Sequence, residues 1–245
     1  MIQYERRLQI LQALRDSELL TLDQFQDILN GVSKSTIRRD LITLANEGEI
    51  VLLRGGAAKL KADSHETAYN SRQLINTEEK ERVAKRAAML VEEGETIYLD
   101  AGTTVTKMCR YLENKHINIV TTSASITKEM HSTLIKCIVV GGELLWNTES
   151  IVGPMTDMEL SNMYFDKAFI GVSGFSSEAG YTTPDPREAR KKQIVKAHSK
   201  KTYVLADGSK SGKITMCKIF DMADVTIICD RETPEITEAG NYIIA

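Results

Sequence analysis

Two adjacent arginines in the segment STIRRDL, residues 35–41, are the first residues with an evident chemical use. Successive residues of a helix are rotated by about 100°, so a helix that buries Ile37 presents Arg39 on its exposed face and Arg38 on its flank. An exposed arginine can read a guanine edge through two hydrogen bonds, whereas an arginine on the flank is better placed for a phosphate. The pattern predicts a DNA contact, but taken alone it also fits arginines that merely solvate a surface helix or pair with Asp40.

The segments around these arginines favour DNA binding. Apolar residues at helical spacing predict three helices within residues 1–48, with N-terminal caps at Thr21 and Ser33. A β-prone run, a Gly-Gly turn and a basic return strand follow at residues 49–60. Three short helices of this kind match a helix-turn-helix, in which the last helix enters the major groove. We therefore predict DNA contacts at Ser33, Ser35, Thr36, Arg38, Arg39 and Arg54.

The remainder of the chain alternates between strands and helices. Runs rich in β-branched residues, such as TIYLD, INIVTTS, KAFIGVSG and KTYVLAD, are separated by helical patterns that include the charged segment REARKKQIVKAHSK. This alternation predicts an open, mainly parallel α/β sheet with helices on both faces. The polar, irregular residues 61–76 form the expected linker between a DNA-binding domain at residues 1–60 and an α/β domain at residues 77–245.

Polar and glycine-rich segments follow several of these strands. DAGTT comes after the first strand, TTS after the second and a glycine pair after the third. Parallel strands end at one edge of an open α/β sheet, where ligands bind. Unhindered N–H groups at a helix start next to Gly102 suit a phosphate, and Asp100 suits a polyol hydroxyl. The same residues also fit a structural role in which Gly102 serves the turn and Thr103 caps the helix. We predict ligand contacts at Asp100, Gly102, Thr103, Thr104, Thr122, Ser123, Gly141 and Gly142.

The segment ADGSKSGK, residues 206–213, is similar to a nucleotide-binding P-loop but lacks its spacing. A P-loop has four residues between its glycines and a Ser or Thr after its lysine. Gly208 and Gly212 are separated by three residues, and Ile214 follows Lys213. These departures argue against a nucleoside triphosphate site.

Composition narrows the class of protein. The 245 residues are 42% hydrophobic and 27% charged, with a net charge of -3, so a DNA contact must come from a local basic patch. The four cysteines are far apart and form no CxxC pair, which argues against a zinc site or a disulfide framework. The N-terminal segment is amphipathic without a long apolar core, and no apolar run reaches membrane-spanning length. We expect a cytoplasmic protein with no signal peptide, no metal, no cofactor and no contact with a membrane.

The segment VSKSTIRRDLITLANEGEIVLLRGGA resembles the winged helix-turn-helix signature of the DeoR family of bacterial transcription regulators. The resemblance continues through EKERVAKRAAMLVEEGETIYLDAGTT, IVVGGELL, SIVGP, FDKAFIGVSGF and LADGSKSGK, so it covers nearly the whole chain. One departure is LDQFQDILNG in the second helix, where the family usually has a Glu-Leu-Ala core. The resemblance implies a repressor of a carbohydrate-metabolism operon, with a C-terminal domain that is similar to sugar-phosphate isomerases and senses a phosphorylated sugar. It also implies that Lys210 is a cation of the effector pocket, with Asp207 on the same turn.

Two other functions are open on the residues alone. An isomerase-like enzyme with a fused DNA-binding domain needs a carboxylate for acid–base chemistry, which Asp100 or Glu143 could supply. The four histidines fall in apparent linkers and helix ends, and the sequence has no HExxH or GxSxG motif, so we predict no catalytic residues. A purely structural or protein-interaction role predicts neither DNA binding nor ligand binding. For a regulator, the expected partners are double-stranded operator DNA, a phosphorylated sugar and further copies of the chain in a homo-oligomer, dimer or tetramer, because paired half-sites need a dimer.

Overall fold

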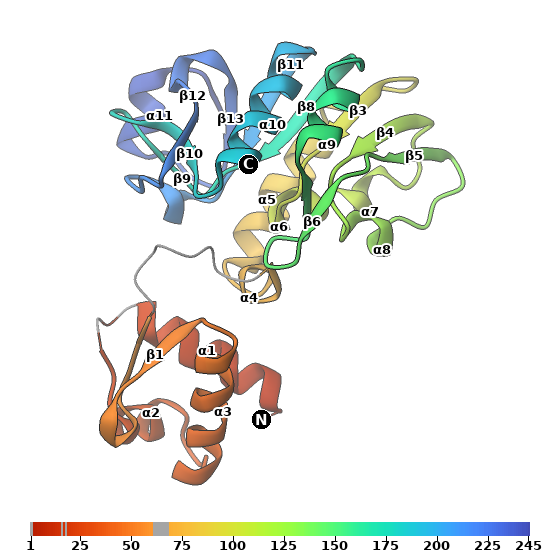
Figure 1. The fold of residues 1–245 in the computed structure, drawn as a ribbon. Helices are drawn as coiled ribbons and strands as arrows, with labels where there is room; N and C mark the ends of the chain where they lie inside the picture. Colours follow the sequence, from red (N-terminus) through yellow and green to blue (C-terminus); the bar gives the residue numbers. More distant parts are fainter. Residues whose placement is uncertain (1, 16, 18, 61–68) are drawn as a thin grey trace. The chain divides into compact units, whose positions relative to one another are not determined.

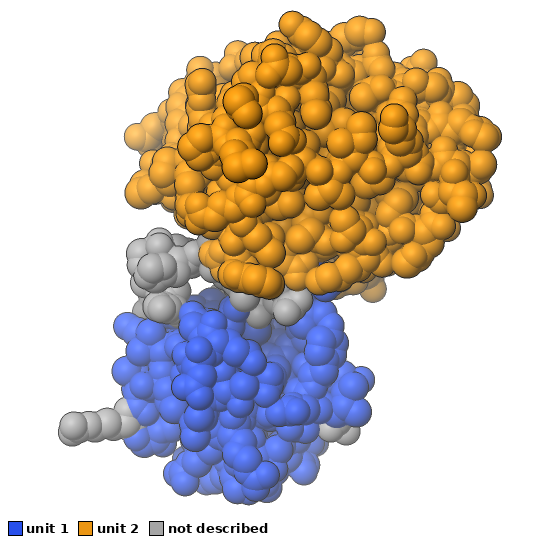
Figure 2. Space-filling model, turned by 45° about the vertical axis from the view of Figure 1, so that its right-hand side comes forward, with its two compact units in different colours: residues 1–75 blue, residues 76–245 orange. Residues whose placement is uncertain are grey.

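The computed structural model describes residues 2–15, 17, 19–60 and 69–245. The chain divides into two compact units, residues 1–75 and residues 76–245 (Figure 2). Within the expected linker, residues 61–68 lie outside the described residues, whereas Tyr69–Gln73 form a short helix, α4.

Unit 1 combines three main helices with a β-hairpin (Figure 1). Its elements before α4 are α1 (Gln3–Arg15), α2 (Leu22–Ile28), α3 (Lys34–Asn46), β1 (Ile50–Leu52), the 3-10 turn η1 (Arg54–Gly56) and β2 (Ala58–Leu60). Strands β1 and β2 are antiparallel, and Leu20 forms a short antiparallel bridge with Ala58. The predicted helices and hairpin are therefore confirmed, and the hairpin of β1, η1 and β2 is called the wing below.

The predicted helix caps are present in unit 1. Thr21 and Gln24 form a reciprocal capping box at the start of α2, and Ser33 accepts a hydrogen bond from the Thr36 N–H at the start of α3. Gly48 follows the end of α3 with a φ of +81°, the left-handed conformation that favours glycine. Apolar side chains of all three helices meet in one core, which contains Ile10, Leu11, Leu14, Leu22, Phe25, Leu29, Ile37, Leu41 and Leu44.

Unit 2 is built on a seven-stranded sheet in which every neighbouring pair of strands is parallel. Across the sheet the strands are β14 (Tyr242–Ile244), β13 (Thr226–Cys229), β11 (Ser199–Leu205), β8 (Phe165–Gly171), β3 (Thr96–Leu99), β4 (Ile117–Thr121) and β5 (Ile135–Val139). The predicted parallel sheet is confirmed. Because all seven strands run the same way, the residues that follow them gather at one edge.

Different helices cover the two faces of this sheet (Figure 1). Side chains alternate along a strand, so Ile97 and Leu99 of β3 join the core on one face and Tyr98 joins the core on the other. The first face packs against α5 (Thr77–Ala88), α6 (Thr103–Thr106), α7 (Cys109–Leu112) and α8 (Ile126–Glu129). The second face packs against α9 (Pro154–Leu160), α10 (Pro186–Ala197) and α11 (Pro234–Ala239).

Short antiparallel pieces and 3-10 turns complete unit 2. Strands β6 (Glu143–Leu145) and β7 (Ser150–Val152) form a hairpin, and β9 (Gly174–Ser176), β10 (Gly180–Thr183) and β12 (Cys217–Phe220) form a small sheet. The 3-10 turns are η2 (Gly208–Lys210) and η3 (Met222–Asp224). The sequence patterns do not predict these antiparallel pieces or the edge strand β14, because runs of three or four residues are too short to show a period.

The glycine pair after β5 has a packing role. The Thr156 hydroxyl of α9 donates a hydrogen bond of 2.8 Å to the carbonyl oxygen of Gly141. Gly142 has a φ of +150°, and a Cβ atom there would lie 2.0 Å from Thr156 Oγ1 and 2.7 Å from the Val152 carbonyl oxygen. Only a residue without a side chain lets β5 turn into β6 so close to the start of α9. The predicted ligand role of both glycines stays a prediction.

We expect Gly142→Ala to destabilise the protein by about 1–3 kcal/mol more than Gly94→Ala, because it forces atoms into space that is already filled. Gly94 is the matched control, since it also has a positive φ (+81°) but no atom lies within 4 Å of its built Cβ. Chemical unfolding of the two variants and the wild type measures the difference. Equal losses of stability in the two variants would show that backbone conformation alone, and not the contact with α9, requires the glycine.

Candidate functional site

Hydroxyl groups gather at the N-terminal end of α3. Ser33 is the N-cap, and its Oγ lies 2.9 Å from both Ser35 Oγ and Thr36 Oγ1. All three belong to the predicted DNA contacts, and the N–H groups of the first helical turn point in the same direction. A helix start that carries hydroxyls and N–H groups is suited to a phosphate of the DNA backbone.

The two arginines of α3 are not paired with Asp40. That carboxylate is buried, and it lies 2.7 Å from Arg6 Nε and 3.7 Å from Arg7 Nε, both on α1. Arg38 and Arg39 are exposed, and within the described part of the chain neither side chain has a hydrogen bond or an ion pair. Of the two alternatives to DNA binding, the pairing with Asp40 does not occur, because α1 supplies the cations instead. The other, that the arginines only solvate the helix surface, is compatible with their exposure.

The wing approaches Arg38 through its glycine turn. Gly55 and Gly56 both have positive φ values (+87° and +85°), and a Cβ built on Gly56 would lie 3.9 Å from Arg38 Nε. The Leu53 N–H closes the turn with a hydrogen bond of 2.7 Å to the Ala57 carbonyl oxygen. Arg54 opens η1 in the same turn. The chain thus brings the glycine turn of the wing close to Arg38 on the flank of α3.

In unit 2, Asp100 lies at the carboxyl end of β3 and has no exposed surface. Its Oδ2 lies 2.9 Å from Lys192 Nζ and accepts a hydrogen bond of 3.2 Å from the Gly171 N–H. Its Oδ1 lies 3.5 Å from Lys191 Nζ. Both lysines come from α10 and are as buried as the carboxylate. Asp100 is therefore an internal counterion to two ammonium groups.

A second carboxylate completes this cluster. Glu188 of α10 is also buried; its Oε2 lies 3.5 Å from Lys192 Nζ and accepts a hydrogen bond of 3.1 Å from the Thr183 hydroxyl. Lys191 donates a hydrogen bond of 2.6 Å to Ser150 Oγ on β7. Asp100, Glu188, Lys191 and Lys192 are called the buried charge cluster below, and their polar partners tie α10 to β3, β7 and β10.

Burial and nearby charges shift the pKa of Lys191 in the buried charge cluster and of Tyr98 beside it. Burial lowers the pKa of Lys191, against the opposing effect of Asp100, and the adjacent Lys192 lowers it further. Burial and the negative charge of Asp100 raise the pKa of Tyr98 well above its ordinary value. The Tyr98 hydroxyl lies 2.6 Å from Thr122 Oγ1 and donates to Asp100 Oδ1 at 3.4 Å. Two of the predicted ligand residues, Asp100 and Thr122, are thus both hydrogen-bonded to the Tyr98 hydroxyl.

Lys191, Lys192 and Glu188 are not among the predicted site residues. For the segment REARKKQIVKAHSK, the sequence pattern predicts only a charged helix between strands. Its signal is the spacing of Glu188, Lys191, Lys192 and Val195, which is i, i+3, i+4, i+7 and places them on one helix face. Charges on the same face as a core valine indicate that the helix buries them.

Lys210 and Asp207 form a second polar group at the same edge of the sheet. Asp207 follows β11, is buried, and accepts a hydrogen bond of 3.1 Å from the Ser209 N–H. Burial raises the pKa of Asp207, but the charge of Lys210 and the hydrogen bonds from its neighbours outweigh burial and leave the pKa below its ordinary value. The Lys210 ammonium donates to the carbonyl oxygen of Val172, directly after β8. Residues 207–210 are called the η2 loop below.

The segment GVSG, residues 171–174, showed no specific chemistry in the sequence, yet it joins the two polar groups. The Gly171 N–H binds Asp100, and the Val172 carbonyl oxygen binds Lys210. A Cβ built on Gly102 would lie 3.6 Å from the Cα of Gly171, so the two backbones approach closely here.

The other predicted ligand residues lie near this region with contacts of their own. Ser123 Oγ lies 2.8 Å from Ser125 Oγ, and Ser123 bridges to Ser150 in β7. Thr103 and Thr104 are buried in the first turn of α6, which has no side-chain cap. The alternative in which Thr103 caps this helix is therefore not seen.

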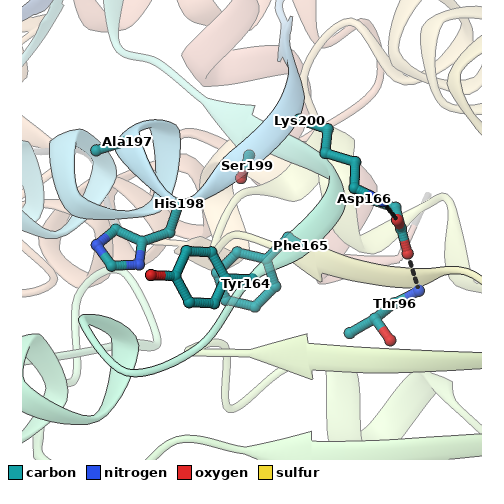
Figure 3. A pocket seen from close by; sticks show the side chains of 8 residues that line it. All are labelled: Thr96, Tyr164, Phe165, Asp166, Ala197, His198, Ser199 and Lys200. Atoms are coloured by element: carbon teal, nitrogen blue, oxygen red, sulfur yellow. Dashed lines mark hydrogen bonds and ion pairs between the residues drawn. The ribbon is translucent and has the colours of Figure 1, made fainter.

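A separate pocket lies at the opposite edge of the sheet, where β3, β8 and β11 begin (Figure 3). It has a volume of about 350 Å³ and is lined by Thr96, Tyr164, Phe165, Asp166, Ala197, His198, Ser199 and Lys200. The rings of Tyr164 and His198 lie 5.0 Å apart, and Lys200 Nζ lies 2.7 Å from Asp166 Oδ1. None of the predicted site residues lines it.

Among the described residues, none of the helices has the length and apolar character that a membrane span requires. In the same part of the chain, no group of three or more His, Cys, Asp or Glu side chains is placed to hold a metal ion.

Both units of the chain match known protein families. Residues 75–231 match the family described as DeoR C terminal sensor domain, and residues 6–62 match the DeoR-like helix-turn-helix domain. The chain belongs to the DeoR family. The resemblance expected from the sequence is confirmed, and the members of this family are transcriptional regulators.

Several DeoR-family relatives match along nearly their whole length. The HTH-type transcriptional regulator FruR of Bacillus subtilis is 36% identical over 93% of this chain and 91% of its own. The lactose phosphotransferase system repressor of Staphylococcus epidermidis is 30% identical over 93% of this chain and 92% of its own. Among solved structures, ribose 5-phosphate isomerase A of Methanocaldococcus jannaschii is 22% identical with a TM-score of 0.41, over 56% of this chain and 55% of that one.

We expect Asp100→Asn to lower the free energy of unfolding by about 3–5 kcal/mol, because it removes the carboxylate beside buried Lys191 and leaves buried Lys192 with Glu188 as its acidic neighbour. Asp221→Asn is the control, since it removes an exposed partner of Lys218 and surface ion pairs contribute little. Thermal and chemical unfolding of both variants test this. If Asp100→Asn were as stable as Asp221→Asn, the lysines would not depend on Asp100 and the carboxylate would be available to a ligand.

Proposed function

We propose that this DeoR-family regulator represses a carbohydrate-metabolism operon and is controlled by a phosphorylated sugar bound in unit 2. The observation that carries the proposal is that Arg38 and Arg39 on α3 are exposed and have no ion pair with any described residue, in a chain whose second unit gathers lysines at the strand ends. Two relatives, the Staphylococcus epidermidis lactose phosphotransferase system repressor and the Bacillus subtilis GlcR, are named as repressors. Their names support a role in sugar metabolism for this chain as well.

A regulator that reads chromosomal operators works in the cytoplasm.

On DNA, α3 lies in the major groove and the wing lies against the backbone. Arg39 contacts a base edge, and Arg38 contacts a phosphate together with the wing residue Arg54. Ser33, Ser35 and Thr36 hold a phosphate at the start of the helix. The ion pair of the buried Asp40 with the partly exposed Arg6 keeps α3 at a fixed position on α1, so that these contacts are made without reordering the unit. A homo-oligomer, dimer or tetramer, presents paired recognition helices to paired half-sites.

In unit 2, the effector combines a phosphate with hydroxyl groups. Lys210 is a half-buried cation at the strand ends and supplies charge to the phosphate, together with the backbone of Gly102 and the hydroxyls of Thr103 and Thr104. Thr122 and Ser123 supply hydroxyl groups to the polyol. Asp100 holds Lys191 and Lys192 at this edge instead of accepting a sugar hydroxyl directly, because both of its oxygens are already engaged.

An isomerase-like enzyme is the less well supported function. Proton transfer needs a carboxylate within reach of the substrate. Asp100 is fully buried against two lysines, and Glu143 is exposed and lies 2.8 Å from the Arg187 guanidinium. Turnover of pentose or hexose phosphates by the full chain, abolished by Asp100→Asn in protein that remains folded, would favour the enzyme.

A thermal-shift screen of the purified protein against phosphorylated sugars is the experiment that tests the proposal. A ligand at 100 times its dissociation constant stabilises the folded state by about 2.7 kcal/mol. Operator binding with and without each stabilising sugar then connects the ligand to regulation. Absence of both a thermal shift and any change in operator affinity across the screen would reject the sugar-phosphate proposal.

For the DNA surface, we expect Arg39→Ala to weaken operator binding by about 1–3 kcal/mol and to relax the preference at one base position. Arg54→Ala should weaken all sequences alike and reduce the slope of affinity against salt by about 1, because it removes a phosphate contact. Titration of operator and shuffled DNA at several salt concentrations separates the two effects. Gln12→Ala, on the exposed side of α1, is the control. An unchanged sequence preference in Arg39→Ala would remove α3 from base recognition.

For the effector site, we expect Lys210→Ala to abolish the change in operator affinity that the sugar causes while leaving ligand-free DNA binding intact. The reason is that Lys210 supplies charge to the effector and none to DNA. Lys213→Ala is the matched control, because Lys213 is an exposed lysine three residues further along the same turn. An unchanged sugar response in Lys210→Ala would place the phosphate elsewhere, and loss of DNA binding without sugar would assign Lys210 to the fold or the oligomer.

A further inference from the structure

Asn76 is the residue at which the chain enters unit 2, and its conformation is unusual. It has φ +50° and ψ +46°, the left-handed region that asparagine tolerates better than most residues with a side chain. It occupies the N-cap position of α5, where an asparagine side chain normally accepts a hydrogen bond from the helix start. Here the side chain makes no such bond. Its amide is directed to another partner.

That partner is the η2 loop. Asn76 Nδ2 donates hydrogen bonds of 2.9 Å to Asp207 Oδ1 and of 2.9 Å to Ser209 Oγ. The positive charge of Lys80, one turn further along α5, also lowers the pKa of Asp207. The first turn of α5 therefore holds the buried carboxylate of the η2 loop through one hydrogen bond and one charge.

The second turn of α5 reaches the same loop through Asp230. The Gly208 N–H donates a hydrogen bond of 2.6 Å to Asp230 Oδ1. Arg82 of α5 places a guanidinium nitrogen 3.9 Å from Asp230 Oδ2. Two buried carboxylates, Asp207 and Asp230, thus each contact both the backbone of the η2 loop and a side chain from the start of α5.

Lys210 lies at the other end of this short loop. The Lys210 N–H donates a hydrogen bond of 3.1 Å to the Asp207 carbonyl oxygen, so the two residues belong to one closed turn. An anion that binds the Lys210 ammonium competes with the Val172 carbonyl oxygen for it. Asp207 and Ser209 are the points where α5 is attached to this turn, so a displacement of the turn by a bound anion would reach α5 there.

We propose that the contact of Asn76 with Asp207 and Ser209 couples the effector site to the DNA-binding unit. The inference rests on the proposed function, since it takes Lys210 as the effector cation. Whatever the arrangement of the two units, the covalent path between them passes through residue 76. Moving the η2 loop changes the backbone direction at Asn76 and hence the chain that leads to unit 1. Asn76 is a positioning residue: it touches neither sugar nor DNA.

The test uses the full chain with Asn76→Gly, because glycine accepts the left-handed conformation and only the side-chain contacts are lost. Glu149→Gly is the matched control: Glu149 also has a positive φ (+54°) and lies outside the η2 loop and α5. Glucose 6-phosphate, fructose 1-phosphate and ribose 5-phosphate serve as probes. Two quantities are measured for each variant: the thermal shift with each probe, and operator affinity with and without it.

The expected result separates binding from response. Wild type and Glu149→Gly should show an effector-dependent change in operator affinity, which for allosteric proteins is about 5–150-fold. Asn76→Gly should keep the thermal shift but lose this change, to within about a factor of two of no response.

Each other outcome overturns the coupling. An undiminished response in Asn76→Gly would show that the signal bypasses residue 76, while the proposed function stands. Loss of the thermal shift in Asn76→Gly would make Asn76 part of the binding site or the fold. If none of the probes changes operator affinity of the wild type, the proposed function fails on this panel, and the coupling fails with it.

Discussion

The position of α10 over the carboxyl ends of the central strands depends on one buried interaction, the pairing of Asp100 with Lys191 and Lys192. A carboxylate without solvent is strongly destabilising unless cations lie beside it, and two unpaired ammonium groups would be equally unfavourable. α10 is therefore held where its lysines reach the end of β3. Because Lys191 also binds Ser150 and Glu188 also binds Thr183, the β6–β7 hairpin and the small sheet are placed by the same charges.

The same physical rule acts on unit 1 with a different consequence. Asp40 is buried in the helical core, and α1 supplies the arginines that neutralise it. This pairing joins α1 to α3. It also leaves Arg38 and Arg39 without an internal acidic partner among the described residues, so their charge faces solvent. A buried carboxylate thus produces a structural contact on one side of α3 and a basic, available surface on the other.

A parallel sheet collects the polar groups of unit 2 at one edge, and backbone segments connect them there. Gly171 and Val172 bind Asp100 and Lys210 in turn, and the η2 loop binds the start of α5 through Asp207. Ligand chemistry and the point of chain entry are therefore parts of one continuous set of hydrogen bonds. Such an arrangement can convert a small displacement at a cation into a change at a distant surface, provided that the ligand binds the two states with different affinity.

Local patterns in the sequence determined the helices of unit 1, the caps at Thr21 and Ser33, the wing, and the parallel strands whose ends carry Asp100, Thr122 and Asp207, because each depends on residues a few positions apart. Only the tertiary structure decided that Lys191, Lys192 and Glu188 are buried, that Arg6 pairs with Asp40, and that Asn76 binds the η2 loop. A charged helix has the same sequence pattern whether its lysines are exposed to solvent or neutralised by a carboxylate. Which of the two occurs depends on a partner that is distant along the chain, and folding alone brings that partner near.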